Sequence, residues 1–138
     1  DIIRSYMVHL IDEDVKCRGP LRMAKKEGDA RKIEACRQTA LSICAEIINM
    51  MSQLIDMAKE LSAVCPAGAL CYAAEGVELA LTAVKITRMY IVSVAAQSPD
   101  ETYRYVTRRE NELTLEACSA AAAEVTSKAE ESLQTVHD

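Results

Sequence analysis

The strongest constraint on the fold of this chain is a helix start near its middle, Ser98-Pro99-Asp100-Glu101, which lies between two long apolar runs. Serine is favoured at a helix N-cap, proline suits the first helical position, and acidic residues stabilise the positive end of the helix dipole. Ser98 and Glu101 also have the spacing of a capping box. One such boundary between two runs of about 30 residues predicts an antiparallel pair of long helices.

Apolar residues recur every three or four positions on both sides of this boundary, so we expect helices and no strands. The sequence predicts an all-α fold, an up-down bundle of long antiparallel helices. With 138 residues the chain has the length of one domain, and we expect a single helical-bundle domain over 1–138. The expected helices cover 2–18, 21–27, 30–64, 70–96 and 99–136.

The boundaries between the earlier helices follow from their turn residues. Gly19-Pro20 is expected to break or kink the first helix, because proline lacks a backbone donor and clashes with the preceding turn. Gly28 ends the short piece that follows, and Asp29 caps the next helix. A turn is expected at Pro66-Ala67-Gly68. The helix over 70–96 has so few charges that we expect it at the centre of the bundle or in a subunit interface.

The net charge of −5 argues against binding to nucleic acid or to an anionic membrane. The longest candidate for a membrane span, Met89–Ser98, is about half as long as a bilayer requires. We therefore expect no nucleic-acid partner, no membrane partner and a cytoplasmic location. The six cysteines form no Cys-x-x-Cys pair, so no metal site is expected and the thiols are expected to be reduced. A disulfide between Cys65 and Cys71 is the alternative.

Acidic residues are densest in the segment Leu10-Ile11-Asp12-Glu13-Asp14. Asp12 and Asp14 are two residues apart and point to different helix faces, so they cannot act as a catalytic pair. If the helix faces inward here, Asp14 is a desolvated carboxylate suited to general acid or base catalysis. The alternative is a solvated acidic patch. No helical di-iron motif, glycine-rich phosphate loop or Ser-His-Asp order is present.

Basic residues cluster between Lys16 and Lys32 and include Arg22, Lys25 and Lys26. A solvated helix face beside a turn explains such a cluster. Alternatively, it attracts an anionic ligand.

Four segments of the sequence also occur in an order that is found in a known protein family. They are Leu10-Ile-Asp-Glu-Asp14, the run from Thr39 to Ala45, Cys65-Pro66 with the alanine-rich 69–83, and Ser98-Pro-Asp-Glu-Thr102. In this order the chain resembles the formiminotransferase-cyclodeaminase and methenyltetrahydrofolate cyclohydrolase family of all-helical folate enzymes. The family's glycine-rich opening segment is absent, and Leu70-Cys71 stands where the family typically has Ser-Asp.

The resemblance implies a helical homodimer that takes a tetrahydrofolate derivative as substrate and needs no bound cofactor. It makes Asp14 the catalytic acid or base, and Arg22, Lys25, Lys26 and Arg88 ligand-binding residues. Two other functions stay open. One is a degenerate, ligand-binding relative, which the Leu70-Cys71 departure favours. The other is a non-catalytic helical-bundle interaction or scaffold module, which the well-capped helices and the missing motifs favour.

Overall fold

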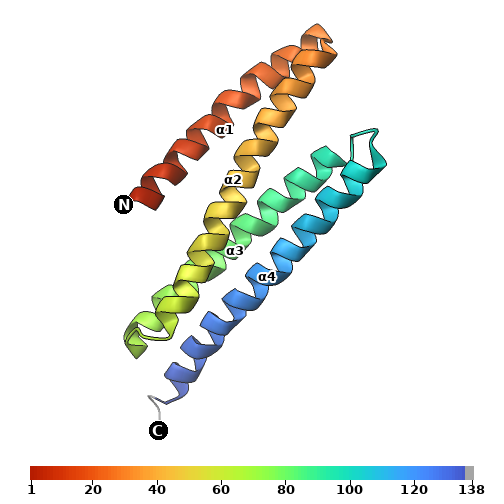
Figure 1. Cartoon of the computed structure of the whole chain (residues 1–138). Coiled ribbons are helices and arrows are strands. Elements are labelled where there is room, and N and C mark those ends of the chain that lie inside the picture. Colours follow the sequence, from red (N-terminus) through yellow and green to blue (C-terminus); the bar gives the residue numbers. More distant parts are fainter. Residues whose placement is uncertain (136–138) are drawn as a thin grey trace. The chain divides into compact units, whose positions relative to one another are not determined.

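The computed structural model describes residues 1–135, which form four helices (Figure 1). No strand occurs within that range, so the predicted all-α class is confirmed, as is the up-down order of long antiparallel helices. The helices are α1 (Ile2–Glu27), α2 (Ala30–Ser62), α3 (Ala67–Ala95) and α4 (Glu101–Gln134).

Contacts within the chain divide it into two compact units, Asp1–Met50 (unit 1) and Met51–Asp138 (unit 2). Helix α2 contributes its first part to unit 1 and its last part to unit 2. The single domain that the chain length predicts stays a prediction.

Unit 1 is a hairpin in which α1 and the first part of α2 run in opposite directions (Figure 1). Gly28 ends α1 with φ 71°, a left-handed conformation that glycine adopts without steric cost. Asp29 Oδ1 then accepts hydrogen bonds from the backbone amides of Arg31 and Lys32 at 3.0 and 3.1 Å. These two neighbouring residues therefore make the tight reversal, as predicted.

The predicted break at Gly19-Pro20 is wrong, because α1 continues through Pro20 to Glu27, while the alternative of a kink stays a prediction. Proline removes one backbone donor, the one that would bond to the carbonyl of Lys16. Both Pro20 and Lys16 are exposed, so water can reach that carbonyl and the helix loses only one bond.

The spacing of apolar residues predicts that Ile3, Met7, Leu10, Ile11 and Val15 share the inner face of the first helix, and the inner stripe of α1 differs from this prediction. Leu10 is buried, but Ile11 and Val15 are 57% and 63% exposed. The inner stripe instead consists of residues that are three or four positions apart, and Asp14 is one of them. Its buried or partly buried members are Ile3, Met7, Leu10, Asp14, Cys17, Leu21 and Ala24.

Unit 2 contains the end of α2 together with α3 and α4. Helix α2 runs parallel to α4, since Lys59 Nζ lies 3.4 Å from Glu124 Oε1 and Lys128 Nζ lies 3.3 Å from Ser62 Oγ. Helices α3 and α4 are antiparallel neighbours (Figure 1). The core of this unit holds four completely buried branched side chains, those of Ile55, Val77, Val84 and Val125.

Two helix boundaries in unit 2 lie elsewhere than predicted. Helix α3 begins at Ala67, so the turn precedes Ala67-Gly68, and Pro66 occupies the N-cap with extended backbone angles. Helix α4 is capped by Asp100, whose Oδ1 accepts the Tyr103 amide at 3.0 Å. A charged carboxylate is a strong cap acceptor.

Ser98 is therefore not the N-cap of α4. Its Oγ accepts the Asp100 amide at 3.2 Å and supports the turn before the cap. The predicted last residue of this helix, Val136, lies outside the described residues.

Among the described residues, one helix is long and apolar enough to cross a membrane, by length and composition alone. This is α2, which contains an 18-residue window of mean hydropathy 1.2, and 28% of that window is buried. The core helix of a soluble protein and a signal sequence near an N-terminus meet the same criteria. The cytoplasmic location stays a prediction.

Candidate functional site

Asp14 lies on the inner stripe of α1, where the helix otherwise carries apolar or small side chains. Its side chain is 24% exposed, and its Oδ2 lies 2.6 Å from Arg18 Nη2, one turn along the helix. The carboxylate is therefore neither fully desolvated nor fully solvated, and its charge is already compensated. Asp12 is exposed, as expected from its different face.

A shallow groove of about 450 Å³ lies beside this segment, between α1 and the first part of α2. The Tyr6 hydroxyl donates a hydrogen bond to Glu46 across it, and this bond raises the pKa of Tyr6. Glu13 lies 3.0 Å from Lys16 Nζ, which lowers the pKa of Glu13. The lining residues are Tyr6, His9, Leu10, Glu13, Gln38, Thr39, Ser42, Ile43 and Glu46.

The groove contains two carboxylates, a histidine and several neutral hydrogen-bonding groups, so it suits a ligand that donates hydrogen bonds. Leu10 and Glu13 come from the acidic segment that the sequence singled out, whereas Asp14 is not among the lining residues. The residues that α2 supplies were not predicted as site residues, although Thr39, Ser42 and Ile43 belong to the segment from Thr39 to Ala45 that the sequence singled out. Their signal in the sequence is the spacing of Gln38, Thr39 and Ser42, which lie within about one turn of the helix.

The predicted basic ligand-binding residues do not form one site. Arg22, Lys25 and Lys26 are all exposed on the last two turns of α1, and none of them lines a pocket described here. Arg88 belongs to α3 in unit 2 and is partly buried. Its Nε is buried and has no hydrogen-bond partner within the described part of the chain.

All six cysteines are free thiols, so Cys65 and Cys71 do not form the alternative disulfide. Cys44 is buried on α2, and burial raises the pKa of its thiol to about 11. A thiol that stays protonated is a poor nucleophile. Within residues 1–135 no group of three or more histidine, cysteine or acidic side chains is arranged to hold a metal ion.

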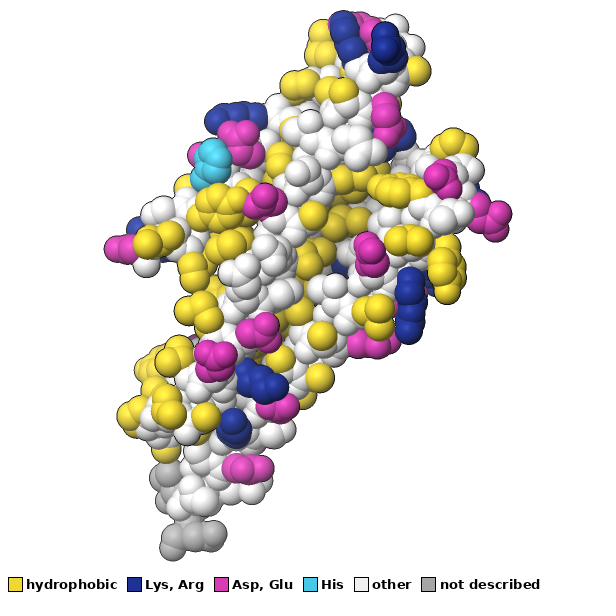
Figure 2. Space-filling model, in the orientation of Figure 1, with side chains coloured by type: hydrophobic (Ala, Val, Ile, Leu, Met, Phe, Trp, Pro, Cys, Tyr) yellow, Lys and Arg dark blue, Asp and Glu magenta, His cyan; other side chains and the backbone are white. Residues whose placement is uncertain are grey.

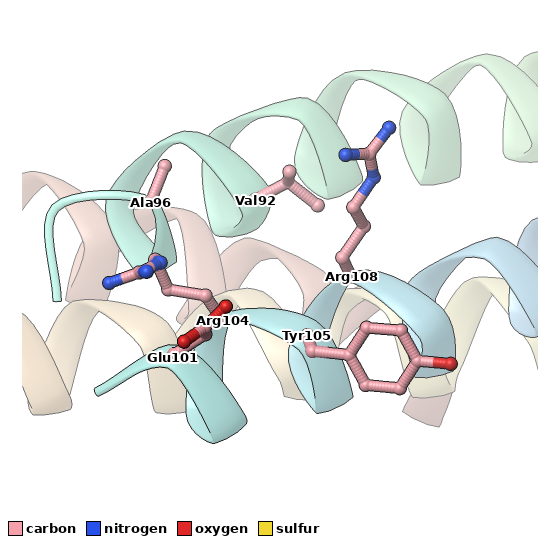
Figure 3. Close-up of a pocket in the computed structure, with 6 residues that line it drawn as sticks. All are labelled: Val92, Ala96, Glu101, Arg104, Tyr105 and Arg108. Carbon is pink, nitrogen blue, oxygen red and sulfur yellow. The ribbon is translucent and has the colours of Figure 1, made fainter. Parts of the chain in front are cut away.

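A second pocket, of about 380 Å³, lies where α3 ends and α4 begins (Figure 3). Arg108 extends from α4 towards α3, and Arg104 lies beside Glu101 at the end of the pocket near Ala96. The Nη1 of Arg104 donates to the Ser98 carbonyl at 2.7 Å, and Nε of Arg108 lies 3.2 Å from Glu112 Oε1. Val92, Ala96 and Tyr105 supply the apolar part of the lining.

Sequence reasoning did not single out Arg104 and Arg108. The signal was present, since the two arginines are four residues apart and therefore on one face of the helix that the Ser98–Glu101 boundary starts.

The outer stripe of α3 is the third feature of interest, and we define it as Tyr72, Leu79, Ile86 and Met89. These side chains are 74%, 73%, 63% and 67% exposed. The first three are seven residues apart, which places them on one face. Figure 2 shows further apolar side chains gathered over the α2–α3 turn, where Leu61 and Val64 are 56% and 80% exposed.

Comparison with known proteins gives no relative. No protein-family model, no curated protein and no solved structure matches this chain. The resemblance to the folate enzymes stays a prediction from the sequence.

Proposed function

We propose that this chain is a non-catalytic interaction module that pairs with a second copy of itself through the outer stripe of α3. The observation that carries the proposal is that α3 has two apolar seams. Its buried seam includes Leu70, Val77, Val84 and Ile91, again seven residues apart. The outer stripe repeats that spacing on a face that solvent reaches.

An exposed apolar stripe of this length is unusual for a helix that acts alone. A surface helix normally turns one apolar stripe to the core and polar residues to water. Large apolar side chains that recur with heptad spacing are the pattern of a helix that packs on another helix. At 1.5 Å per residue α3 is about 44 Å long, enough for four heptads.

The charges beside the stripe favour a second copy in the antiparallel direction. Glu75 and Glu78 belong to the first half of α3, and Lys85 belongs to the second half. Glu78 and Lys85 are seven residues apart and lie on the same flank of the stripe. In an antiparallel pair, Glu78 of each copy approaches Lys85 of the other, whereas in a parallel pair these flanks lie on opposite sides of the seam and the charges do not pair. Opposite charges that flank an apolar seam select the orientation of a helix pair.

Sedimentation equilibrium tests this proposal. The wild-type chain should be a dimer, and Leu79→Glu/Ile86→Glu should be a monomer, because two carboxylates would be buried in the seam. Val106→Glu/Leu113→Glu is the matched control. It changes two exposed apolar residues, also seven apart, on α4 of the same unit.

A charge exchange tests the orientation separately. Glu78→Lys should weaken the dimer, and adding Lys85→Glu should restore it. A monomeric wild-type chain at about 100 μM, or equal loss in the α4 control, would refute the pairing. A single exchange with no effect would refute the antiparallel orientation.

A second candidate function is that of a folate-binding or cyclohydrolase-like protein, the function that the sequence resemblance implies. The position of Asp14 favours it, because it places a carboxylate that is only 24% exposed on the otherwise apolar inner stripe of α1. The test is a thermal-shift screen with tetrahydrofolate derivatives on wild type, Asp14→Asn and the exposed neighbour variant Asp12→Asn.

A folate at 100 times its Kd should add about 2.7 kcal/mol of stability. We expect this stabilisation in wild type and Asp12→Asn and its loss in Asp14→Asn. No stabilisation by any folate, or equal loss in both variants, would exclude this function.

A further inference from the structure

The pocket between the end of α3 and the start of α4 has a composition that suits one class of ligand. Arg104 and Arg108 each bring a guanidinium group, and Glu101 brings one carboxylate, so the lining carries a formal charge of +1. Each guanidinium has five N–H donors, and the hydrogen bonds to Ser98 and Glu112 use few of them. Planar guanidinium groups bind carboxylates in a bidentate manner.

The surroundings of the pocket reinforce its positive charge. The lining includes residues of the first two turns of α4, near the positive end of its dipole. Arg88 precedes Val92 by four residues, so it lies one turn away on the same face of α3. Its buried Nε without a hydrogen-bond partner is a donor that a water or an anion would satisfy.

The remaining lining is apolar. Val92 and Ala96 form the wall on α3, and the Tyr105 ring belongs to α4 (Figure 3). An apolar wall and an aromatic ring bind a flat hydrocarbon body better than a bare inorganic ion. The volume of about 380 Å³ admits a ligand of one or two fused rings.

We infer that this pocket binds a small organic carboxylate with a flat apolar body. Its carboxylate pairs with Arg108 and with the unused donors of Arg104, and its rings pack against Val92 and Tyr105. The site is independent of the outer stripe of α3 and of the groove in unit 1.

The experiment titrates 2-naphthoate into the full chain at low ionic strength and follows backbone amides by ¹H–¹⁵N NMR. Amides around 92–108 should shift and saturate. The neutral isostere 2-naphthamide should bind at least about fivefold more weakly, because it keeps the rings and loses the charge. Inorganic phosphate is a third probe, and it should bind more weakly than naphthoate because it lacks the rings.

Arg108→Gln should raise the Kd for naphthoate about fivefold, as expected for a partly exposed charged contact. Arg109→Gln is a matched control, since Arg109 also pairs with Glu112, at 3.5 Å, but does not line the pocket. The control should leave the Kd within about twofold of wild type. Both substitutions remove only exposed ion pairs, so the fold is retained.

Three results would overturn the inference. They are no saturable shift up to about 10 mM naphthoate, equal weakening in Arg109→Gln, and equal binding of naphthamide. Repeating the titration on Leu79→Glu/Ile86→Glu separates this site from dimer formation, because the proposed pocket needs only one copy.

Discussion

Units 1 and 2 are both built from long helices, yet they bury very different amounts of apolar side chain. Among the described residues, five buried apolar side chains belong to unit 1 and fourteen to unit 2. All four of the largest completely buried side chains belong to unit 2. In unit 1 two helices pack along a single seam, and solvent reaches both sides of it. In unit 2 three helices surround a core. Helix length therefore says little about burial.

The seams of the two units also differ in chemistry. In unit 1 the seam includes Asp14, Cys17 and Cys44, and burial is the main cause that raises the pKa of both thiols. In unit 2 the seam is made almost entirely of alanine and branched aliphatic residues. We therefore expect the apolar core of unit 2 to stabilise the fold. We expect the stability of unit 1 to depend on pH, because its seam contains titratable groups.

The largest expected effect is in the core of unit 2. Ile55→Ala should lower the free energy of unfolding by about 2–5 kcal/mol, because it leaves a cavity where the side chain is completely buried. Leu10→Ala in unit 1 should cost less, since an open seam lets water fill the space. Urea denaturation measures both values, with the exposed Ile11→Ala as control. An equal cost at Leu10 would contradict the comparison.

The next effect is a pH dependence that arises from Cys44 in unit 1. The pKa of Cys44 rises from 9.0 to about 11 on folding, so the folded state keeps a proton that the unfolded state releases. This contribution to stability is complete below pH 9 and is lost between pH 9 and 11. The loss is at most about 1.4 kcal/mol per pH unit.

Urea midpoints of wild type and Cys44→Ala at several pH values isolate this group. The wild type should lose more stability than the variant between pH 9 and 11. Leu10→Ala, which removes no titratable group from the same seam, is the control and should keep the wild-type pH dependence. Identical profiles for wild type and Cys44→Ala would refute the prediction.

Two glycines of α1 should respond in opposite directions. Gly28→Ala should destabilise the chain by about 1 kcal/mol, because its φ of 71° strains any L side chain. Gly19→Ala should stabilise it by about 0.5–1 kcal/mol, because Gly19 lies inside a helix with nothing within 4 Å of an added Cβ. Thermal unfolding of both variants tests the pair, and a destabilising Gly19→Ala would indicate a real break at this point.

The smallest expected effect concerns the cap of α4 in unit 2. Asp100→Ala should cost about 1 kcal/mol, and Ser98→Ala should cost clearly less, because only Asp100 accepts a helical amide. Chemical denaturation of the two variants compares them. A larger loss of unfolding free energy in Ser98→Ala than in Asp100→Ala would show that Ser98 is the N-cap of α4.

Most of the fold could be predicted from sequence patterns, and most of the candidate site could not. The spacing of apolar residues along α2 and the turn residues Gly28 and Asp29 agree with the structure, because both depend on neighbours in the chain. The break at Pro20 and the cap at Ser98 were wrong. The helix continues through Pro20, and Asp100 instead of Ser98 accepts the helical amide of Tyr103.

The candidate pockets needed contacts between residues far apart in the chain. Asp14 was recognised by its position in a motif, but its pairing with Arg18 appears only in the structure. The sequence did not single out Arg104 and Arg108, and only the structure places Val92 and Ala96 in the same pocket lining. The polar groove in unit 1 likewise depends on Tyr6 and Glu46, which are 40 residues apart.

By itself the sequence determined the helices of this protein, because their periodicity and capping are local properties of the chain. Only the tertiary structure decided which apolar stripe of α3 is buried and which remains exposed, because both have the same seven-residue spacing. The helix α3 has more apolar faces than its neighbours in unit 2 cover, and the outer stripe is the face that remains.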